Sequence, residues 1–397
     1  MPRPLVAILL PPEDFGAALR RAWAAGEAVL PLPLDAPAGV LEGLVDTLRP
    51  ARIVADAADL DAGIDTGGDQ PAHVDDDVAL VVATSGSTGR PKGVVLTHAA
   101  LDASTRASMD RLRCQPGERW LLALPLHHVA GIQVMLRAWR LGTEPVVVDP
   151  AATESIATAD AEHVSLVPTQ LARLVEAGAD LGRFRTILLG GASADRALLR
   201  QAARTGGRVV ISYGMTETCG GCVYDGVALD GIEVRVRDDG RIEVRGPVLF
   251  AGYLGGPEPA SSWPVDDDGW FTTGDFGRIA GGRLEVLGRS DDVIIRGGEN
   301  VPLDAVAAAL RTHPAIADAA AVTRPDRDWG EIVVAVVVPM DTASPPDLAE
   351  LRTHVLATHP RAYAPHALVL TDALPRDQLG KLRRTGLDAL ANGPERG

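Results

Sequence analysis

The chain has 397 residues, of which 46% are hydrophobic and 23% are charged, and its formal net charge is −15 at pH 7. This length and composition allow two or three domains with buried cores, and the acidic balance argues against a general nucleic-acid or anionic-membrane surface. Three cysteines are too few for a disulfide framework, and we find neither a secretory signal nor an apolar run of roughly 20 residues. We therefore expect a cytoplasmic protein without a membrane span.

The first half of the chain contains the pattern of a mostly parallel α/β sheet. The apolar, β-branched run at 78–83 is typical of a buried strand, and Thr97 is placed to cap a helix that ends near residue 113. We also predict helices at 14–25 and 38–49, and strands at 52–56, 120–124, 144–149, 163–168, 185–191 and 208–214. Because these strands alternate with helices, ligand-binding loops should follow their carboxyl ends.

From residue 232 the pattern changes to short strands. Residues 232–246 are typical of a β-hairpin that turns at Asp239 and Gly240, and residues 283–292 end this β-rich region. The last hundred residues predict a helix at 303–312 and strands at 319–323, 331–338 and 367–371. We therefore expect a large N-terminal α/β domain over 1–290, with a small β-rich subdomain, and a mobile C-terminal α+β domain over 291–397.

The segment "TSGSTGRPKG" follows the predicted strand 78–83 and offers hydroxyl and backbone N–H groups to phosphate. It is not a Walker A loop, because Lys92 follows Pro91 and precedes Gly93 rather than standing between Gly and Ser or Thr. Pro91 also disfavours helical geometry at Arg90, so no helix should begin directly at the phosphate. Such a loop suits a pyrophosphate that must be held and then released.

Lys92 is one of only two lysines among 38 basic residues, and Lys381 is the other. An ammonium is a compact point charge that a planar guanidinium cannot replace. The two retained lysines are therefore informative, and the motifs around them have to show what each could do.

Further motifs follow the phosphate loop in a fixed order. They are "LPLHHVAGI" (124–132), "LLGGAS" (188–193), "SYGMTET" (212–218), "GWFTTGD" (269–275), "LGRSDDVIIRGGENV" (287–301) and "LPRDQLGK" (374–381). Over residues 78–385 this set resembles the adenylate-forming superfamily of acyl-CoA synthetases, peptide-synthetase adenylation domains and luciferases. The resemblance implies two half-reactions. A carboxylate attacks the α-phosphorus of ATP to give an acyl-adenylate and pyrophosphate, and a thiol then displaces AMP to give a thioester.

The resemblance also assigns roles to charged residues. Two anions meet in the first half-reaction, which requires Mg²⁺ and a cation at the forming bond. Glu217 is the expected Mg²⁺ carboxylate, with Thr88 as a further ligand. Lys381 is expected between the attacking carboxylate and the α-phosphate, in the first half-reaction only. Asp275 can accept hydrogen bonds from both ribose hydroxyls, and Arg289 would add positive charge nearby.

Other residues of the motifs are expected to contact the nucleotide, the acyl group or CoA. The expected nucleotide contacts are Thr84, Ser85, Gly86, Ser87, Thr88, Gly89, Lys92, Gly190, Gly191, Ala192, Ser212, Tyr213, Gly214 and Thr216. The expected acyl pocket is lined by His128, Gly131, Gly214, Gly220 and Gly221, and Gly220 and Gly221 would leave room for a ring. The C-terminal domain is expected to rotate about Asp291, after which Gly297 and Gly298 would let backbone approach the pantetheine arm of CoA.

Two further patterns allow a second interpretation. His127 and His128 could be metal ligands, but adjacent side chains point apart and no partner cluster is evident, so we interpret His128 as a pocket wall or gate. Cys219 and Cys222 have redox spacing but no second pair, and we interpret them as small packing residues. Cys114 is expected to be structural.

The substrate is suggested by the resemblance alone. The phosphate loop begins at residue 84, which is early for this superfamily, so we expect much of the usual N-terminal subdomain to be missing. A chain shortened in this way that contains "YGMTETCGGCVYDG" resembles the o-succinylbenzoate–CoA ligases of menaquinone biosynthesis. This resemblance implies that ATP and CoA are cosubstrates and that Mg²⁺ is required. A dicarboxylate needs a second anchor, but Arg137 and Arg140 are equally typical of helix surface charges, so neither is assigned.

Three alternatives stay open. The first is a CoA ligase for another aromatic or medium-chain acid, and the second is an adenylating enzyme that loads a carrier protein. The third is a non-catalytic adenylate-binding protein, which intact Lys381, Glu217 and Asp275 argue against. The oligomeric state is also open, with a homodimer among the alternatives.

Overall fold

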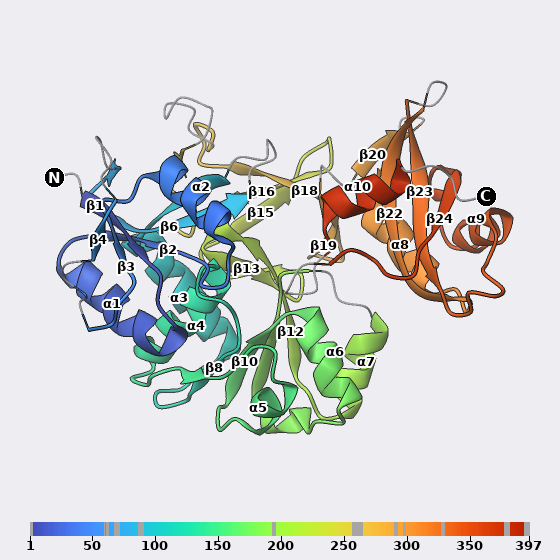
Figure 1. Cartoon of the computed structure of the whole chain (residues 1–397). Coiled ribbons are helices and arrows are strands. Elements are labelled where there is room, and N and C mark those ends of the chain that lie inside the picture. The colour runs from blue at the N-terminus through green and yellow to red at the C-terminus, as the bar shows by residue number, and fades with distance from the viewer. Residues whose placement is uncertain are drawn as a thin grey trace. The chain divides into compact units, whose positions relative to one another are not determined.

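The computed structural model describes residues 3–58, 60, 63–66, 72–85, 91–192, 196–255, 265–289, 293–296, 299–326, 330–376 and 382–392. The chain divides into two compact units, whose elements are labelled in Figure 1. The first unit comprises Met1–Val234 and Val244–Phe271, and the second comprises Arg235–Glu243 and Thr272–Gly397. The predicted hinge at Asp291 lies outside the described residues, so the domain boundary near it stays a prediction.

The first unit contains a mixed sheet in the order β17–β7–β6–β2–β1–β3–β4, with β5 beside β1. Its strands are β1 (Arg3–Ile8), β2 (Ala28–Pro31), β3 (Arg52–Val54), β4 (Ile64–Asp65), β5 (His73–Val74), β6 (Val78–Ser85), β7 (Pro91–Thr97) and β17 (Gly252–Leu254). The central pairs are parallel, whereas β7 pairs antiparallel with β6 and with β17. The buried strand predicted at 78–83 is confirmed, and the residues after the phosphate loop form a strand rather than a helix.

The second sheet of this unit has the order β14–β13–β12–β11–β10–β8–β9. Its strands are β8 (Trp120–Leu122), β9 (Val146–Val147), β10 (His163–Leu166), β11 (Thr186–Leu189), β12 (Val209–Met215), β13 (Gly220–Tyr224) and β14 (Val227–Ala228). All pairs from β12 to β9 are parallel, and β13 turns back antiparallel on β12. The predicted parallel α/β sheet is thereby confirmed, and the carboxyl ends of β8, β11 and β12 share one edge.

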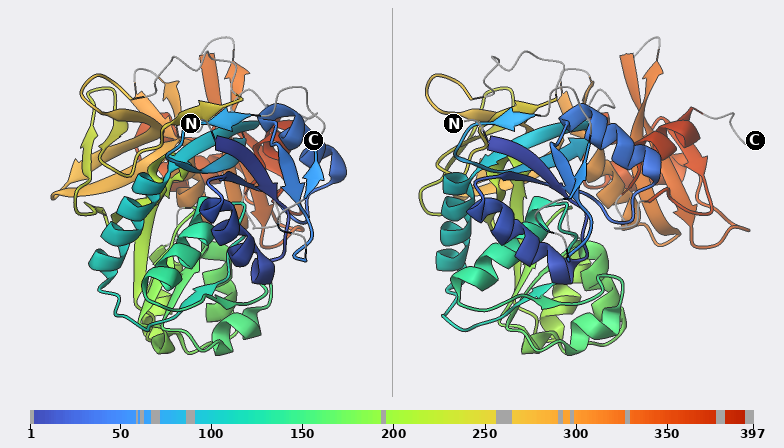
Figure 2. Two further views of the ribbon diagram at one scale, coloured as in Figure 1. Left: turned by 90° about the vertical axis from the view of Figure 1, so that its left-hand side faces the viewer. Right: turned by 60° about the vertical axis from the view of Figure 1, so that its left-hand side comes forward.

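Helices flank these sheets, as the two further views in Figure 2 show. They are α1 (Pro12–Ala24), α2 (Ala38–Leu48), α3 (His98–Leu112), α4 (Val129–Arg140), α5 (Thr153–Thr158), α6 (Pro168–Glu176) and α7 (Arg196–Arg204). Thr97 caps α3 as predicted, because its Oγ1 accepts a hydrogen bond of 3.1 Å from the backbone N–H of Ala100. Helix α3 packs on β6 and β7 of the first sheet and on β13 of the second.

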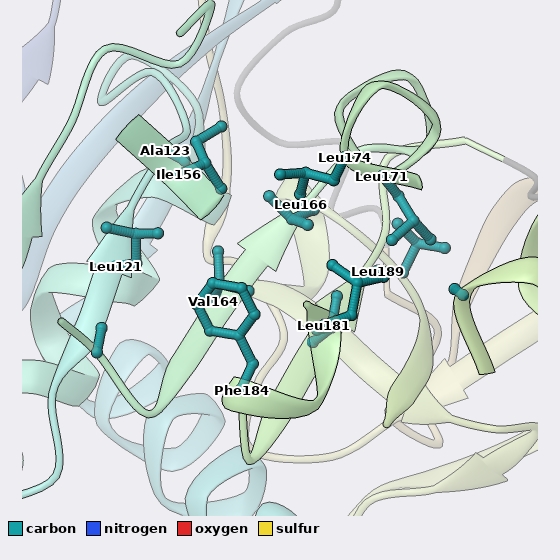
Figure 3. Packing of buried hydrophobic residues seen from close by; sticks show 13 residues of the cluster. Leu121, Ala123, Ile156, Val164, Leu166, Leu171, Leu174, Leu181, Phe184 and Leu189 are labelled. Atoms are coloured by element: carbon teal, nitrogen blue, oxygen red, sulfur yellow. The ribbon is translucent and has the colours of Figure 1, made fainter. Parts of the chain in front are cut away.

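The second sheet has its own apolar core, shown in Figure 3. Val164, Leu166 and Leu189 project from neighbouring strands toward Leu171 and Phe184, and all of them are at most 2% exposed. Parallel strands covered by helices are apolar on both faces, which explains why this region of the sequence shows continuous apolar runs.

Replacing Phe184 by alanine is expected to lower the free energy of unfolding by about 3–5 kcal/mol, because it removes a ring from this core and leaves a cavity. Chemical denaturation monitored by circular dichroism would measure the change. Val227→Ala, at a position 38% exposed, is the control and should change stability little. A Phe184→Ala loss as small as that of the control would contradict the packing role.

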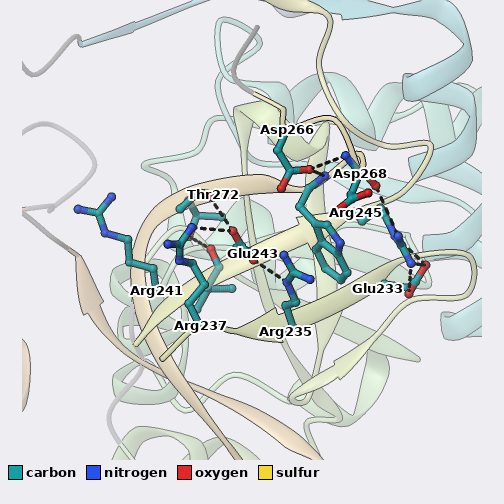
Figure 4. A network of polar contacts seen from close by, with 12 residues as sticks. Glu233, Arg235, Arg237, Arg241, Glu243, Arg245, Asp266, Asp268 and Thr272 are labelled. Carbon is teal, nitrogen blue, oxygen red and sulfur yellow. Dashed lines mark hydrogen bonds and ion pairs between the residues drawn. The ribbon is translucent and has the colours of Figure 1, made fainter. Parts of the chain in front are cut away.

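A further sheet, most of whose residues belong to the second unit, has the order β15–β16–β18–β19. Its strands are β15 (Glu233–Val236), β16 (Arg241–Arg245), β18 (Phe271–Ala280) and β19 (Arg283–Arg289), which confirms the predicted hairpin. Glu243 is 1% exposed and accepts hydrogen bonds from Arg235 (2.6 Å) and Thr272 (2.8 Å), as drawn in Figure 4. Burial alone would raise the pKa of Glu243, but these bonds outweigh it and hold the pKa below its usual range.

The rest of the second unit is an α+β fold, as predicted. Strands β22 (Ile316–Asp326), β23 (Gly330–Pro339) and β24 (Ala367–Leu370) form a sheet, and β20 (Val293–Arg296) pairs with β21 (Glu299–Pro302). The helices are α8 (Leu303–Arg311), α9 (Leu348–Leu356) and α10 (Arg384–Ala391). None of the helices in the described ranges is long and apolar enough to cross a membrane.

Candidate active site

The predicted phosphate loop connects two antiparallel strands. Thr84, near the end of β6, stands opposite Lys92 on β7, and its hydroxyl donates a long hydrogen bond of 3.4 Å to the Lys92 carbonyl. Gly86, Ser87, Thr88 and Gly89 lie outside the described residues, as does the side chain of Ser85. The hairpin thus fixes where the loop starts and ends, and the phosphate contacts of the loop stay predictions.

Glu217 lies where the two sheets of the first unit meet. It belongs to the single turn η2 (Thr216–Thr218) that follows β12, and its side chain is 14% exposed. The backbone N–H of Phe250 donates to the Glu217 carbonyl at 2.9 Å, which ties this turn to the segment before β17. The structure therefore brings the carboxylate predicted for Mg²⁺ to the strands that carry the phosphate loop.

Lys92 and Tyr253 surround the Glu217 carboxylate. The Tyr253 hydroxyl donates a hydrogen bond of 2.9 Å to Glu217 Oε1, and Lys92 Nζ lies 3.7 Å from the same oxygen. Lys92 Nζ also lies 3.7 Å from the centroid of the Tyr253 ring, a cation–π contact. Sequence reasoning proposed Lys92 and Glu217 but missed Tyr253, because nothing in the pattern shows that β17 pairs with β7.

The residues predicted for the adenine side follow two neighbouring strands. Gly190, Gly191 and Ala192 come directly after β11, and Ser212, Tyr213 and Gly214 form the carboxyl end of β12, which Thr216 of η2 follows. A methyl group built on Gly190 would lie 3.6 Å from Ser212 Cβ, so the two segments are in contact. The structure brings these predicted residues together, and parallel strands commonly bind ligands at this edge.

The glycines predicted for the acyl pocket are required by close backbone packing. A Cβ atom would lie 2.0 Å from the Gly220 carbonyl oxygen if placed on Gly214, and 2.3 Å from the Pro125 carbonyl oxygen if placed on Gly131. On Gly221 it would lie 2.2 Å from Ser212 Oγ. The space beside Gly221 is therefore filled by the protein's own atoms, which corrects the expectation that this glycine leaves room for a ring. Pocket lining by these residues stays a prediction.

Two helices hold the turn after Glu217. The carbonyl of Cys219 accepts hydrogen bonds from Ser104 of α3 (3.1 Å) and Gln133 of α4 (2.9 Å). Thr105 donates a hydrogen bond of 3.0 Å to Gln133 Oε1, so the Gln133 side chain is itself held in place. Cys219 has a φ of +53°, a conformation that costs a non-glycine residue free energy and needs such support.

The expectation that His127 and His128 point apart is wrong. Their ring centroids lie 4.3 Å apart at an interplanar angle of 47°. The alternation of side chains applies to strands, whereas these two residues form the turn before α4. Burial and the neighbouring His128 lower the pKa of His127 to about 4, so its ring is neutral at pH 7. Among the described residues, neither histidine belongs to a cluster with the spacing of metal ligands.

None of the three cysteines, all of which lie in the described part of the chain, forms a disulfide, and Cys219 and Cys222 are fully buried. Burial raises the pKa of the Cys219 thiol, and it raises that of Cys114 to about 11. Because the thiolate is the reactive form, we expect Cys219 and Cys222 to resist alkylation in the native protein at pH 8. Mass spectrometry after iodoacetamide treatment would measure this, with the urea-unfolded chain as the control. Rapid native labelling of either residue would contradict its packing role.

Arg137 is buried, so the surface position that the sequence left open for it is excluded. It is 3% exposed, its Nε donates a hydrogen bond of 3.0 Å to Ser108 Oγ, and its guanidinium lies 4.8 Å from the Trp120 ring centroid. Arg140 does lie at the surface, where it pairs with Asp102 at 2.5 Å. Helix α4 is covered on most sides, so a polar residue on it need not face solvent.

The second unit carries the residues predicted for the ribose. Asp275 on β18 and Arg289 on β19 are cross-strand partners, and Arg289 Nε lies 3.9 Å from Asp275 Oδ1. Asp275 is 14% exposed and Arg289 is 61% exposed, so the arginine has room to reach a ligand. Asp291, Gly297, Gly298 and Lys381 lie outside the described residues, and their roles stay predictions.

Comparisons with known proteins find two matching families and named relatives. The AMP-binding enzyme family matches residues 34–254, and the family described as the AMP-binding enzyme C-terminal domain matches residues 305–381. A Mycobacterium tuberculosis H37Rv protein named "Probable 2-succinylbenzoate–CoA ligase" is 44% identical over 79% of this chain and 85% of its own length. The 2-succinylbenzoate–CoA ligase of Bacillus licheniformis is 35% identical over 78% of this chain and 69% of its own.

Solved structures extend the similarity to the whole fold. The o-succinylbenzoate CoA synthetase of Bacillus subtilis, in complex with the acyl-adenylate intermediate, has a TM-score of 0.83 and 27% identity over 97% of this chain and 88% of its own. The same synthetase in complex with ATP and magnesium ion has a TM-score of 0.82 and 26% identity over 97% of this chain and 89% of its own.

Proposed function

The chain belongs to the AMP-binding enzyme family, and on that basis we propose that it is an ATP-dependent acid–CoA ligase acting on o-succinylbenzoate in menaquinone biosynthesis. The reaction forms o-succinylbenzoyl-adenylate and pyrophosphate, and CoA then displaces AMP to give the thioester. The observation that carries the chemistry is the convergence of Lys92 and Glu217, which are far apart in the sequence. The relatives named above support the choice of acid.

The donor set at Glu217 fits magnesium. Mg²⁺ prefers oxygen ligands and is commonly held by one or two carboxylates together with substrate phosphates. The metal, when bound, would neutralise charge on the phosphate oxygens. Lys92 brings its ammonium to within 3.7 Å of the Glu217 carboxylate and can hold the leaving pyrophosphate. Tyr253 orients that carboxylate by hydrogen bonding.

The experiment is an assay of ATP-dependent pyrophosphate release with a panel of carboxylic acids, with and without CoA, in which mass spectrometry follows the thioester. Release with o-succinylbenzoate, and its CoA adduct only when CoA is present, would support both half-reactions. Release without a CoA adduct would point to a carrier-protein acceptor. Turnover of a different acid alone would keep the chemistry and overturn the proposed substrate.

We also propose that the enzyme acts in the cytoplasm, where ATP and CoA are available. The oligomeric state, for which a homodimer is one open alternative, can be tested by sedimentation equilibrium of the purified chain. A molar mass equal to the 41.5 kDa of one chain at all concentrations would reject it.

A further inference from the structure

Tyr253 contacts both charged residues of the candidate phosphate site. Its hydroxyl donates to Glu217 Oε1 at 2.9 Å, and the face of its ring lies under Lys92 Nζ at 3.7 Å. The pairing of β17 with β7 fixes this arrangement, because Tyr253 stands opposite Val94, two residues beyond Lys92. One side chain on a short strand therefore determines where an ammonium and a carboxylate lie.

The phenol is suited to act as a constant donor. Burial raises the pKa of Tyr253, and the neighbouring Glu217 carboxylate raises it further. A tyrosine hydroxyl, with an ordinary pKa near 10, is in any case protonated at pH 7 and can donate this hydrogen bond. The ring also packs against Phe250 at a centroid distance of 4.8 Å, which restricts its rotation.

The ammonium and the carboxylate are close but do not form a direct hydrogen bond. Lys92 Nζ lies 3.7 Å from Glu217 Oε1, beyond the usual hydrogen-bond range of about 2.7–3.2 Å. Lysine has a flexible stem, so an unsupported ammonium would move onto the buried carboxylate. In this structure Oε1 already accepts from Tyr253, and the ring offers the ammonium a second attractive surface.

We propose that Tyr253 is a positioning residue that holds Lys92 and Glu217 apart, so that Lys92 takes a phosphate oxygen while Glu217 takes Mg²⁺. The inference rests on the proposed function, since it assigns these two ligands to that site. The hydroxyl orients the carboxylate, and the ring directs the ammonium. Removing the hydroxyl should therefore weaken mainly Mg²⁺ binding, and removing the ring should weaken phosphate binding.

Two substitutions separate these contributions. Tyr253→Phe keeps the ring and removes the hydroxyl, and we expect the Mg²⁺ concentration for half-maximal pyrophosphate release to rise about tenfold. MgATP binding, measured by calorimetry without any acid, should weaken by a similar factor. Inhibition by pyrophosphate should weaken less than in a variant without the ring, because the phenylalanine ring still attracts the Lys92 ammonium. Tyr253→Leu also removes the ring, and it should in addition weaken pyrophosphate inhibition about fivefold.

Tyr224→Phe is the matched control. Tyr224 is 1% exposed and shares a hydrogen bond of 2.7 Å with Ser108, so its loss removes a buried phenol contact away from Glu217. Its Mg²⁺ dependence should equal that of the wild type. Unchanged Mg²⁺ dependence and MgATP binding in both Tyr253 variants would overturn the proposal, as would equal effects of the two variants on pyrophosphate inhibition. If the wild type binds MgATP but activates no acid, the proposed substrate fails while the positioning test is still valid.

Discussion

Replacing Lys381 by alanine is expected to lower the rate of acyl-adenylate formation by about 10²–10³-fold, the usual effect of losing one group that stabilises developing charge in a transition state. The first half-reaction brings a carboxylate against the α-phosphate, and a compact ammonium between them offsets their repulsion. Lys381 is the last residue matched by the C-terminal domain of the family. Its role is implied by the motif "LPRDQLGK", since its side chain lies outside the described residues.

The two half-reactions allow a sharp measurement for Lys381. Pyrophosphate release reports adenylation, whereas synthetic acyl-adenylate mixed with CoA reports thioester formation alone. We expect Lys381→Ala to lose the first activity and keep the second. Arg383→Ala, which removes an exposed cation two residues away, should keep both. Equal losses in both half-reactions would contradict a role confined to adenylation, and normal adenylation by Lys381→Ala would reject the role altogether.

The sequence predicted the parallel part of the fold well because strands that are buried on both faces have a recognisable local pattern of apolar residues. Strands β10 and β11 are buried on both faces. The run of Ile187, Leu188 and Leu189 in β11 is the apolar pattern that such burial favours, whereas the buried His163 and Ser165 interrupt it in β10. Strands β1 and β2 were not predicted, although both are largely buried. Each contains a proline, Pro4 in β1 and Pro31 in β2, a residue that is unusual inside a strand, and their parallel pairing is visible only in the fold.

The candidate site was predicted as separate pieces rather than as an arrangement. The glycines, hydroxyls and lysine near residue 92 and the acid at Glu217 carry chemical signals that can be recognised in isolation. Their contact depends on β17 pairing with β7, which places Tyr253 beside both. Tyrosine in a strand is common, so this residue has no distinguishing signal in a single sequence.

Two points that the sequence left open or misjudged depend on tertiary packing. A surface position for Arg137 was left open, because charged residues on helices usually face solvent. Helix α4 instead packs against β8 and β13, so Arg137 is buried with Ser108 and Trp120. Likewise, the space beside Gly221 depends on where Tyr224 and Ser212 lie. Arg137 meets residues of another helix and of a strand, whereas Gly221 meets residues of its own hairpin. In neither case does a local sequence pattern show where the neighbouring side chains lie.

Replacing Glu217 by glutamine is expected to lower adenylation by about 10²-fold, because the variant loses a charged oxygen ligand and with it several kcal/mol of metal-assisted stabilisation. Glutamine has nearly the same shape, and its amide oxygen can still accept the hydrogen bond of Tyr253, so the fold should persist. The substitution also leaves Lys92 without its carboxylate neighbour at 3.7 Å. The lysine is then free to bind phosphate more tightly, so inhibition by pyrophosphate should strengthen while the rate falls.

The opposite changes in rate and pyrophosphate affinity distinguish this role of Glu217 from general damage to the site. Initial rates of pyrophosphate release over a range of Mg²⁺ concentrations would show whether excess metal partly restores activity, as expected for a weakened ligand. Glu233→Gln is the matched control, since it removes the same charge from an exposed pair with Arg245. Exposed ion pairs of this kind contribute little to the stability of a protein, so the control variant should fold normally and keep the wild-type rate. A Glu217→Gln enzyme with the wild-type rate and Mg²⁺ dependence would mean that another carboxylate holds the metal.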